Sequence, residues 1–483
     1  MHAFIQGACP WLDKHVKSYL QKHVPDVIFI DDFADFPTDA DTVFQFCDGW
    51  NLNQNFAVLN TADTALINAY PNSDALARKD FLARVVEYWT AKRQDSILKD
   101  HVPLTVRLSL DYSEYLDDAL TAADDLTLLY SLEDNEGKVK ADREWWILKP
   151  ALVDCGAGIR IFSTVEELAG NLELAAEIEE EEEEDSELFE DHEATQGPVF
   201  DKQDPSGSNP DSFSPSLSNP CLSSLDALVT ATGNLTLSRA IDKGRKPPSL
   251  SFEINEHQRI PSAQMREFVA QRYIVSVPLL ENRKWHARAY VLSVGRLKVH
   301  VFREMLALLA IRDYEPPWKN PSLGSSLTNT ALQDEDEIVS KKSMRDFWTA
   351  PDNMLPGDWK NRIFDQICDI SAELFRATAH TMSDRFTPLD KCFELFAVDF
   401  LIDSTGNPWL LEVNETPAFY ENGIAGEIAQ RLMESVICVV MEHMGKAQVG
   451  DPQNAAARAR MVEVLDETEK LAKSNVTEIV PEY

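Results

Sequence analysis

The chain has 483 residues, 44% of them hydrophobic, which is enough for two or three domains with apolar cores. Its formal net charge of −36 disfavours nonspecific binding to nucleic acid. No apolar run approaches the roughly 18 residues of a membrane helix, and no signal-peptide pattern or C-x-x-C motif occurs. We therefore expect a soluble cytoplasmic or nuclear protein without a membrane partner, a disulfide framework or a zinc site.

The first part of the chain mixes short apolar runs with turn residues. Residues 26–72 include VIFIDDF and FAVLN and predict a small α/β unit, so we set a first domain at residues 1–74. Ser73 is placed to cap a following helix. The apolar residues at helical spacing in that helix are Leu82, Val85, Val86 and Trp89.

The stretch EWWILKPALVDCGAGIRIF predicts a strand, a small-residue loop and a second strand. Lys149 leaves the first strand, and Gly156 and Gly158 form a lone G-x-G, a weak signal by itself. A lysine beside such a loop could contact phosphates, or it could simply extend its ammonium group to water. No G-x-x-x-x-G-K-[ST] motif occurs, which argues against a P-loop enzyme.

An acidic segment follows. Residues 166–215 hold eighteen acids and one lysine, and a Ser/Pro/Asn tract begins near their end. This composition cannot bury enough apolar surface to fold alone, so we expect a disordered insertion at about 175–250. The insertion would interrupt a central domain of residues 75–281.

Ordered structure is expected again from Ile260, with a C-terminal domain at residues 282–445. QRYIVSVPLL and WHARAYVLSVGRLKVHVF predict strands, the second with a hairpin turn at Gly295. Two helical stripes predict ordinary core packing: Ile363, Ile367, Ile370 and Leu374, then Ile428, Leu432, Val436 and Val439. Residues 446–483 are predicted to form a helical or flexible tail.

The most basic stretch is residues 259–303, with nine basic and two acidic residues, and it could form a local anion site. Arg296 and Lys298 share one face of a strand because alternate residues point the same way. Two interpretations stay open. The pair could dock an acidic C-terminal peptide, or it could be a solvated basic strand edge that discourages aggregation.

Near the end, Asp399 and Glu412 interrupt two apolar runs on either side of the turn signal STGN. If these four turn residues form the loop, Asp403 pairs with Pro408. That register places Asp399 directly opposite Glu412 in an antiparallel hairpin.

Facing carboxylates repel each other, and a cation between them removes the repulsion. Asn414 shares the face of Glu412, so two carboxylates and an amide would offer the hard oxygen ligands that suit Mg²⁺. The alternative is an exposed face on which both acids are solvated.

Read in chain order, these blocks resemble one family. Lys149-Pro150-Ala151, the G-x-G loop, QRYIVSVPLL, RKWHAR, LTNTALQ and FELFAVDFLIDSTGNPWLLEVNETPAF are similar to the tubulin–tyrosine ligase family, most closely its shorter fungal members. The resemblance covers roughly residues 65–440. It implies the ATP-grasp fold, of α+β (mixed α/β) class, with ATP and Mg²⁺ held between two subdomains.

The resemblance also implies roles for individual residues. Asp399, Glu412 and Asn414 match the family's Mg²⁺ ligands. The positions that match its nucleotide contacts are Lys79, Lys149, Gly156, Gly158, Lys284 and Asn329, with Gln271, Tyr273 and Ile274 at the adenine hinge. Lys149, Arg288, Arg303 and Glu412 match its catalytic residues, although Arg312 is a second candidate for the position given to Arg303.

Three positions depart from the family pattern. His286 stands at the Asp of R-K-F-D-x-R, Ser326 stands where many members have His, and Asp154-Cys155 precedes the G-x-G loop. The first and third could weaken nucleotide contacts or mark an altered specificity.

The family chemistry is ligation, in which a carboxylate attacks the γ-phosphate of ATP and an amine then displaces the phosphate. The resemblance implies that tyrosine is joined to the C-terminal Glu of α-tubulin, or another amino acid to another acidic protein tail. The alternative is a catalytically altered nucleotide-binding protein that acts as an interaction module, for example in cytoplasmic mRNA-processing assemblies.

Overall fold

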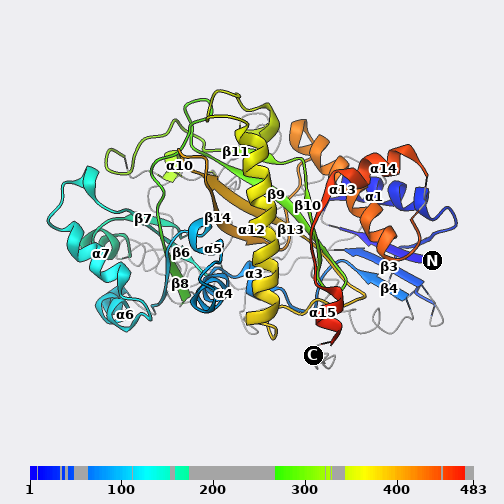
Figure 1. Cartoon of the computed structure of the whole chain (residues 1–483), viewed down its shortest axis with the longest axis horizontal. Helices are drawn as coiled ribbons and strands as arrows, with labels where there is room; N and C mark the ends of the chain where they lie inside the picture. The colour runs from blue at the N-terminus through cyan, green and yellow to red at the C-terminus, as the bar shows by residue number, and fades with distance from the viewer. Residues whose placement is uncertain are drawn as a thin grey trace, which may run out of the picture.

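The computed structural model contains three β-sheets with their helices. The described residues are 1–7, 9–32, 35–37, 42–47, 64–110, 113–152, 158–172, 267–320, 323–326, 328, 343–447 and 450–473. The insertion predicted at about 175–250 lies outside them. Figure 1 shows an elongated molecule with the N-terminal strands at one end, α6 (Leu116–Ala122) and α7 (Thr127–Asn135) at the other, and a large sheet between.

The N-terminal unit is a parallel sheet of order β2-β1-β3-β4 with one packed helix. Its elements are β1 (His2–Gln6), α1 (Pro10–His23), β2 (Ile28–Ile30), β3 (Thr42–Cys47) and β4 (Thr64–Ile67). The predicted α/β unit is therefore present, but its central strand β1 and helix α1 precede the residues that predicted it. The Ile67 amide donates to the Lys391 carbonyl at 3.0 Å, which joins this unit to the C-terminal sheet.

The helix predicted after Ser73 is broken into two. Its parts are α3 (Asp74–Ala77) and α4 (Lys79–Lys92), followed by α5 (Leu98–His101). Arg78 between them has an extended backbone, and the Ser73 hydroxyl accepts no capping hydrogen bond from the helix. That hydroxyl lies 3.0 Å from a Glu394 carboxylate oxygen instead.

The central sheet is antiparallel, of order β5-β8-β6-β7. Its strands are β5 (Thr105–Ser109), β6 (Trp146–Pro150), β7 (Arg160–Phe162) and β8 (Glu267–Arg272). One face packs its core residues, among them Trp146 and Phe162, against leucines of α6 and α7. Short 3-10 turns lie at η2 (Ser113–Tyr115) and η3 (Lys140–Asp142).

The C-terminal sheet is organised around β9 (Trp285–Val294). The other strands are β10 (Lys298–Phe302), β11 (Leu306–Leu309), β12 (Met344–Asp346), β13 (Phe393–Ile402), β14 (Pro408–Asn414) and β15 (Met461–Asp466). Strand β13 pairs with nearly all of β9 on one edge, while β11 and β10 share the other edge. The predicted turn at Gly295 is confirmed, with a φ of 60° that favours glycine.

Two long helices cover opposite faces of this sheet. They are α12 (Trp359–Thr381), which crosses the sheet in Figure 1, and α13 (Gly423–His443). Alternate residues of β9 enter separate cores: Ala287 and Ala289 pack with α12, and Leu292 and Val294 pack with α13. Both predicted helical stripes are buried in these cores, as expected.

The C-terminal tail differs from its prediction, because β15 pairs with β10 inside the sheet. The remaining short elements are α10 (Leu323–Ser326), η6 (Phe347–Thr349), α14 (Pro452–Ala459) and α15 (Thr468–Lys473). None of the described helices is both long and apolar enough to cross a membrane.

Candidate nucleotide and metal site

The β13–β14 hairpin carries the two predicted acids opposite each other. Asp399 pairs with Glu412, as expected. The pairing next to the turn differs from the prediction, because Pro408 pairs with Ile402 rather than with Asp403. The turn is one residue longer than predicted, and a bulge after Asp399 compensates for it.

Asp403 organises that longer turn. Its carboxylate accepts the backbone N–H groups of Thr405 at 2.9 Å and Asn407 at 3.0 Å, and the Trp409 indole N–H at 2.9 Å. Partial burial alone would raise the pKa of Asp403, but these hydrogen bonds to the charged form lower it. The turn is therefore ordered by the Asp403 carboxylate and is longer than the predicted four-residue loop.

Asp399 is 2% exposed and is held by a guanidinium group from the neighbouring strand. Arg288 lies directly opposite it on β9, and two of its nitrogens donate to the two carboxylate oxygens at 2.9 and 2.8 Å. His286 Nε2 lies 3.5 Å from Oδ1, and Asn414 donates its amide to Oδ2 at 3.3 Å. Burial alone would raise the pKa of Asp399, but Arg288 and His286 lower it far below its usual range.

These charges occupy a sheet face that is apolar elsewhere. Towards the end of β9, this face contributes three residues to the core under α13: Tyr290, Leu292 and Val294. Towards its start, the same face carries Arg288 and His286. Strand β13 changes in parallel, from Ala397 in the core to Asp399 at the site. The site therefore begins where the apolar core of this face ends.

Glu412 and Asn414 extend the oxygen-rich edge of the hairpin. Both are half-buried, and the Glu412 carboxylate has no ion pair or hydrogen bond with the side chains that the structure describes. Among the described residues, no three His, Cys, Asp or Glu side chains surround a metal position. A cation here would thus use Asp399, Glu412 and Asn414 with further oxygens from phosphate or water, which is how Mg²⁺ is usually held.

A second wall carries buried lysines. Lys149, on β6, is 6% exposed and donates to the Gln271 side-chain oxygen on β8 at 3.0 Å. Lys284, just before β9, is 4% exposed and donates to the Ile274 carbonyl at 3.3 Å. Its ammonium group lies 3.7 Å from the centre of the Tyr273 ring. The structure therefore brings together these five residues, which the sequence assigned to nucleotide binding.

The acids of the hairpin act on the pKa of Lys149. Burial lowers the pKa of Lys149, while Glu412 and Asp399 act on it in the opposite direction. Burial and then repulsion from Lys149 lower the pKa of Lys284 to about 7. Two buried ammonium groups with one neutral acceptor each are poorly satisfied, and a phosphate would supply the missing acceptors. The residues present therefore fit a nucleotide phosphate chain.

An apolar cluster lies beside the lysines. It combines Trp145, Ile147, Ile159, Ile161 and Tyr273 with the half-buried Val275, Ile311 and Trp318. Tyr273 is the one member of this set that the family resemblance assigns to the nucleotide site. The missed signal was the segment IRDYEPPWKN, which places Ile311, Tyr314 and Trp318 directly after β11. Tyr314 donates its hydroxyl to the Val275 carbonyl at 2.9 Å and thereby ties that segment to the hinge.

Other predicted residues fall into three groups. Lys79 begins α4, and its charge lowers the pKa of Lys149, so it lies near the site. Gly158 has a φ of 70°, which favours glycine, at the end of the predicted loop. Gly156 and Asn329 lie outside the described residues. Thr328, next to Asn329, contacts Nδ1 of His286 through its hydroxyl.

Arg303 has surroundings different from those its predicted role requires. Its guanidinium group lies 4.7 Å from the Trp348 ring centre and 4.6 Å from that of Phe364, and it donates to the Asn361 side chain. These contacts attach it to α12 and to Trp348 of η6, on the sheet face opposite the Asp399 side chain. The other candidate, Arg312, is exposed beyond the end of β11.

The basic pair Arg296 and Lys298 lies at the far end of β9 from Arg288. Lys298 is paired with Asp466 at 2.9 Å and with Glu463 at 3.9 Å, and the Asp466 hydrogen bond raises its pKa. The structure contradicts the solvated-edge interpretation for Lys298. Strand β15 covers β10, so the strand is not a solvated edge, and its acids already neutralise Lys298.

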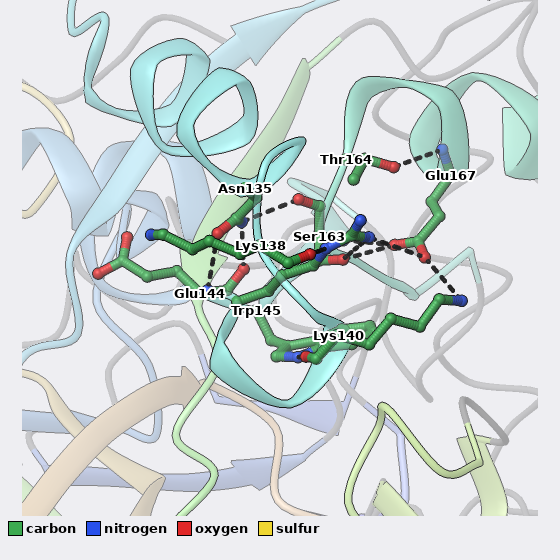
Figure 2. Close-up of polar contacts among 9 residues, drawn as sticks. Asn135, Lys138, Lys140, Glu144, Trp145, Ser163, Thr164 and Glu167 are labelled. Carbon is green, nitrogen blue, oxygen red and sulfur yellow. Dashed lines mark hydrogen bonds and ion pairs between the residues drawn. The ribbon is translucent and has the colours of Figure 1, made fainter.

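A polar network joins the start of β6 to the end of β7 (Figure 2). Asn135, fully buried, donates to the Glu144 and Ser163 carbonyls at 2.8 and 2.9 Å and accepts the Glu144 N–H at 3.0 Å. Glu167 accepts the Ser163 N–H and hydroxyl, both at 2.8 Å. Glu144 precedes β6 and Ser163 follows β7, so the network holds the strands that carry Lys149 and lead to Gly158.

Most of the chain is similar in sequence to one known protein family. Residues 58–192 and 240–448 match the sequence model of the tubulin-tyrosine ligase family. A probable tubulin–tyrosine ligase of Schizosaccharomyces pombe is 34% identical over 411 residues, which cover 84% of this chain and 85% of that protein. The probable tubulin–tyrosine ligase PBY1 of Saccharomyces cerevisiae is 29% identical over 86% of this chain, which spans 48% of that protein.

A solved structure has the same fold. It is the C-terminal domain of K. lactis Pby1, described as an ATP-grasp enzyme interacting with the mRNA decapping enzyme Dcp2. The TM-score is 0.60 at 23% identity, and the match covers 96% of this chain and 98% of that one. The likeness confirms the predicted ATP-grasp fold.

Proposed function

Because the chain belongs to the tubulin–tyrosine ligase family and has the ATP-grasp fold, we propose that it joins an amino acid to a protein carboxylate using ATP. The observation that carries this proposal is the meeting of two walls of opposite charge. Lys149 and Lys284 lie on one, and Asp399 and Glu412 lie on the other. A polyphosphate–metal complex offers negative phosphates to the lysines and a positive metal ion to the acids.

In this proposal, ATP supplies the phosphoryl group that activates the carboxylate, and Mg²⁺ neutralises charge on the phosphates. Asp399, Glu412 and Asn414 would hold the metal. Lys149, Lys284 and Arg288 would hold the phosphates and stabilise the charge that spreads over them during transfer. The catalytic role proposed from the sequence for Arg303 is not retained, since its guanidinium group packs on α12.

The apolar cluster around Tyr273 would take the adenine and exclude water from the reacting groups. No protein nucleophile is required, because positioning and charge stabilisation suffice for this chemistry. Gln271 orients Lys149 and bonds the Thr105 hydroxyl at 3.2 Å, which ties the phosphate contact to β5.

For the substrates, we propose tyrosine as the amine and the C-terminal Glu of α-tubulin as the carboxylate, in the cytoplasm. The names of the two yeast relatives support this choice. His286 is the main reason to test other amino acids, because an imidazole replaces the acid of the family motif beside Asp399.

The test is incubation of the full chain with ATP, Mg²⁺ and detyrosinated tubulin, in parallel with labelled tyrosine, glutamate and glycine. ATP-dependent tyrosine incorporation that is lost in Glu412→Gln is the expected result. Incorporation of glutamate or glycine alone would keep the ligase and replace the amine. No incorporation of any of them, together with normal ATP binding, would overturn tubulin ligation.

A second candidate is a nucleotide-binding protein that works by assembling partners. The solved relative's interaction with Dcp2 favours it. Pull-down with the decapping enzyme in the presence and absence of ATP separates the two candidates, because a ligase needs no stable complex with that partner.

A further inference from the structure

The Arg288–Asp399 pair uses both oxygens of the carboxylate proposed to bind the metal. The two bonds measure 2.9 and 2.8 Å, and Asn414 adds a third contact at 3.3 Å to Oδ2. The pair is embedded between adjacent strands, with the Asp399 side chain 3% exposed and that of Arg288 14% exposed. Parallel N–H bonds of this kind are among the strongest side-chain contacts, and a guanidinium group stays charged at every physiological pH.

A divalent cation and this guanidinium group therefore compete for the same atoms. Removing either without a replacement would leave a buried, uncompensated carboxylate, which is strongly unfavourable. Glu412, directly across the hairpin, has no such partner among the described side chains. A cation arriving alone would meet one available carboxylate and one that is already neutralised.

A polyphosphate changes this balance because it offers Arg288 another anion. Arg288 lies opposite Asp399, which pairs with Glu412 across the hairpin, and both of these acids act on the pKa of Lys149. Phosphate oxygens between these walls would attract the guanidinium group and the lysines together.

We propose that Arg288 prevents divalent cations from binding Asp399 in the nucleotide-free site. A polyphosphate then binds Arg288 and leaves the Asp399 oxygens available to the metal. This inference rests on the proposed nucleotide site, and it adds an order of binding. Arg288 acts here as a positioning residue through Asp399. Metal and polyphosphate enter together, and metal alone binds poorly.

The experiment measures Mn²⁺ binding to the full chain without nucleotide, by the enhancement of water proton relaxation. Arg288→Met should bind Mn²⁺ at least about tenfold more tightly than the parent chain. The same variant should melt at a lower temperature without metal, and Mn²⁺ should restore it. Inorganic tripolyphosphate should produce protein-bound Mn²⁺ in the parent chain.

The matched control is Arg376→Met. Arg376 also donates to a buried carboxylate, that of Glu467, at 2.8 Å, but outside the site. It should lower stability without changing Mn²⁺ affinity. If Arg288→Met does not fold, Arg288→Lys serves, because a single ammonium group covers both oxygens poorly, and its affinity should lie between parent and Met.

Equal Mn²⁺ affinity in the parent and the Arg288 variants would overturn the proposal, as would tight Mn²⁺ binding to the parent without polyphosphate. Adding Asp399→Asn to Arg288→Met should abolish the gained binding. Persistent binding in that double variant would place the metal elsewhere and overturn the exchange at Asp399. None of these readouts involves ligation, so failure of the ligase assay leaves the inference standing.

Discussion

Each wall of the site includes one hairpin, and the two hairpins are stabilised in different ways. The β13–β14 pair extends over six residue pairs, and its turn is fixed from within by Asp403. The β6–β7 pair extends over three residue pairs, and the Asn135 network fixes it from behind. The turn of the metal-side hairpin is thus ordered by its own residues, whereas the hairpin that carries Lys149 depends on Asn135 of α7 and on Glu167.

The difference shows where each wall can be disturbed. Each hairpin ends in an edge strand, but β13 pairs with nine residues of the long strand β9, which should hold the β13–β14 hairpin even when its turn is weakened. A three-pair hairpin at a sheet edge relies on a few buried hydrogen bonds, and losing one leaves unsatisfied groups in the interior. Substitutions outside the site should therefore destabilise the hairpin that carries Lys149 more than the β13–β14 hairpin.

The largest effect is expected from Asn135→Ala. It leaves buried groups of Glu144 and Ser163 without partners, which should lower the free energy of unfolding by roughly 2–4 kcal/mol. Denaturant unfolding and hydrogen exchange in β6 and β7 measure it. The matched control, Asn407→Ala, removes one exposed bond to the Asp100 carbonyl from the other hairpin. Equal losses would contradict the comparison.

Lys149→Met should weaken ATP binding about tenfold to a hundredfold, because one charge-assisted contact is worth about 1.5–3 kcal/mol. The unfolding free energy should stay the same or rise, since the variant removes a buried ammonium group. Calorimetry and thermal unfolding test both parts. Lys298→Met, which breaks the distant pair with Asp466, should leave ATP affinity unchanged. A destabilised Lys149 variant with normal affinity would make the lysine structural.

ATP affinity should fall as the pH rises through 7. Lys284 has a pKa of about 7 and loses its charge above that value, so a phosphate then meets a neutral amine. The decrease should approach about tenfold per pH unit while one proton is taken up on binding. The neighbours that face it are Lys149, Tyr273 and Tyr314. In Lys284→Met the pH dependence should disappear; an unchanged slope would assign it to another group.

The smallest effect is expected at the turn. Asp403→Ala should lower the unfolding free energy by about 1 kcal/mol at neutral pH. Because the folded-state pKa of Asp403 is lowered, its contribution is present above the unfolded value near 3.9 and is lost as the pH falls. The parent and the variant should therefore converge in acid. A gap that persists there would show that the neutral side chain, not the charge, orders the turn.

Much of the acid wall could be predicted because its cause is local. Alternation along the strands and the STGN turn signal are enough to place Asp399, Glu412 and Asn414 on one face of the predicted hairpin. The turn length was wrong by one residue because Asp403 accepts three N–H groups, a preference that apolar periodicity does not contain. The Asn135 network was missed because its members lie on three separate segments.

The sequence alone determined the strand faces, the helical core stripes and the position of the acids, since each depends on residue periodicity and local turn chemistry. The tertiary structure decided which charges meet. Arg288 faces Asp399, Lys298 faces Asp466, and Arg303 packs on α12. Periodicity fixes the face on which a side chain lies, but not the element that packs beside it, so partners distant in the sequence appear only when the sheet is assembled.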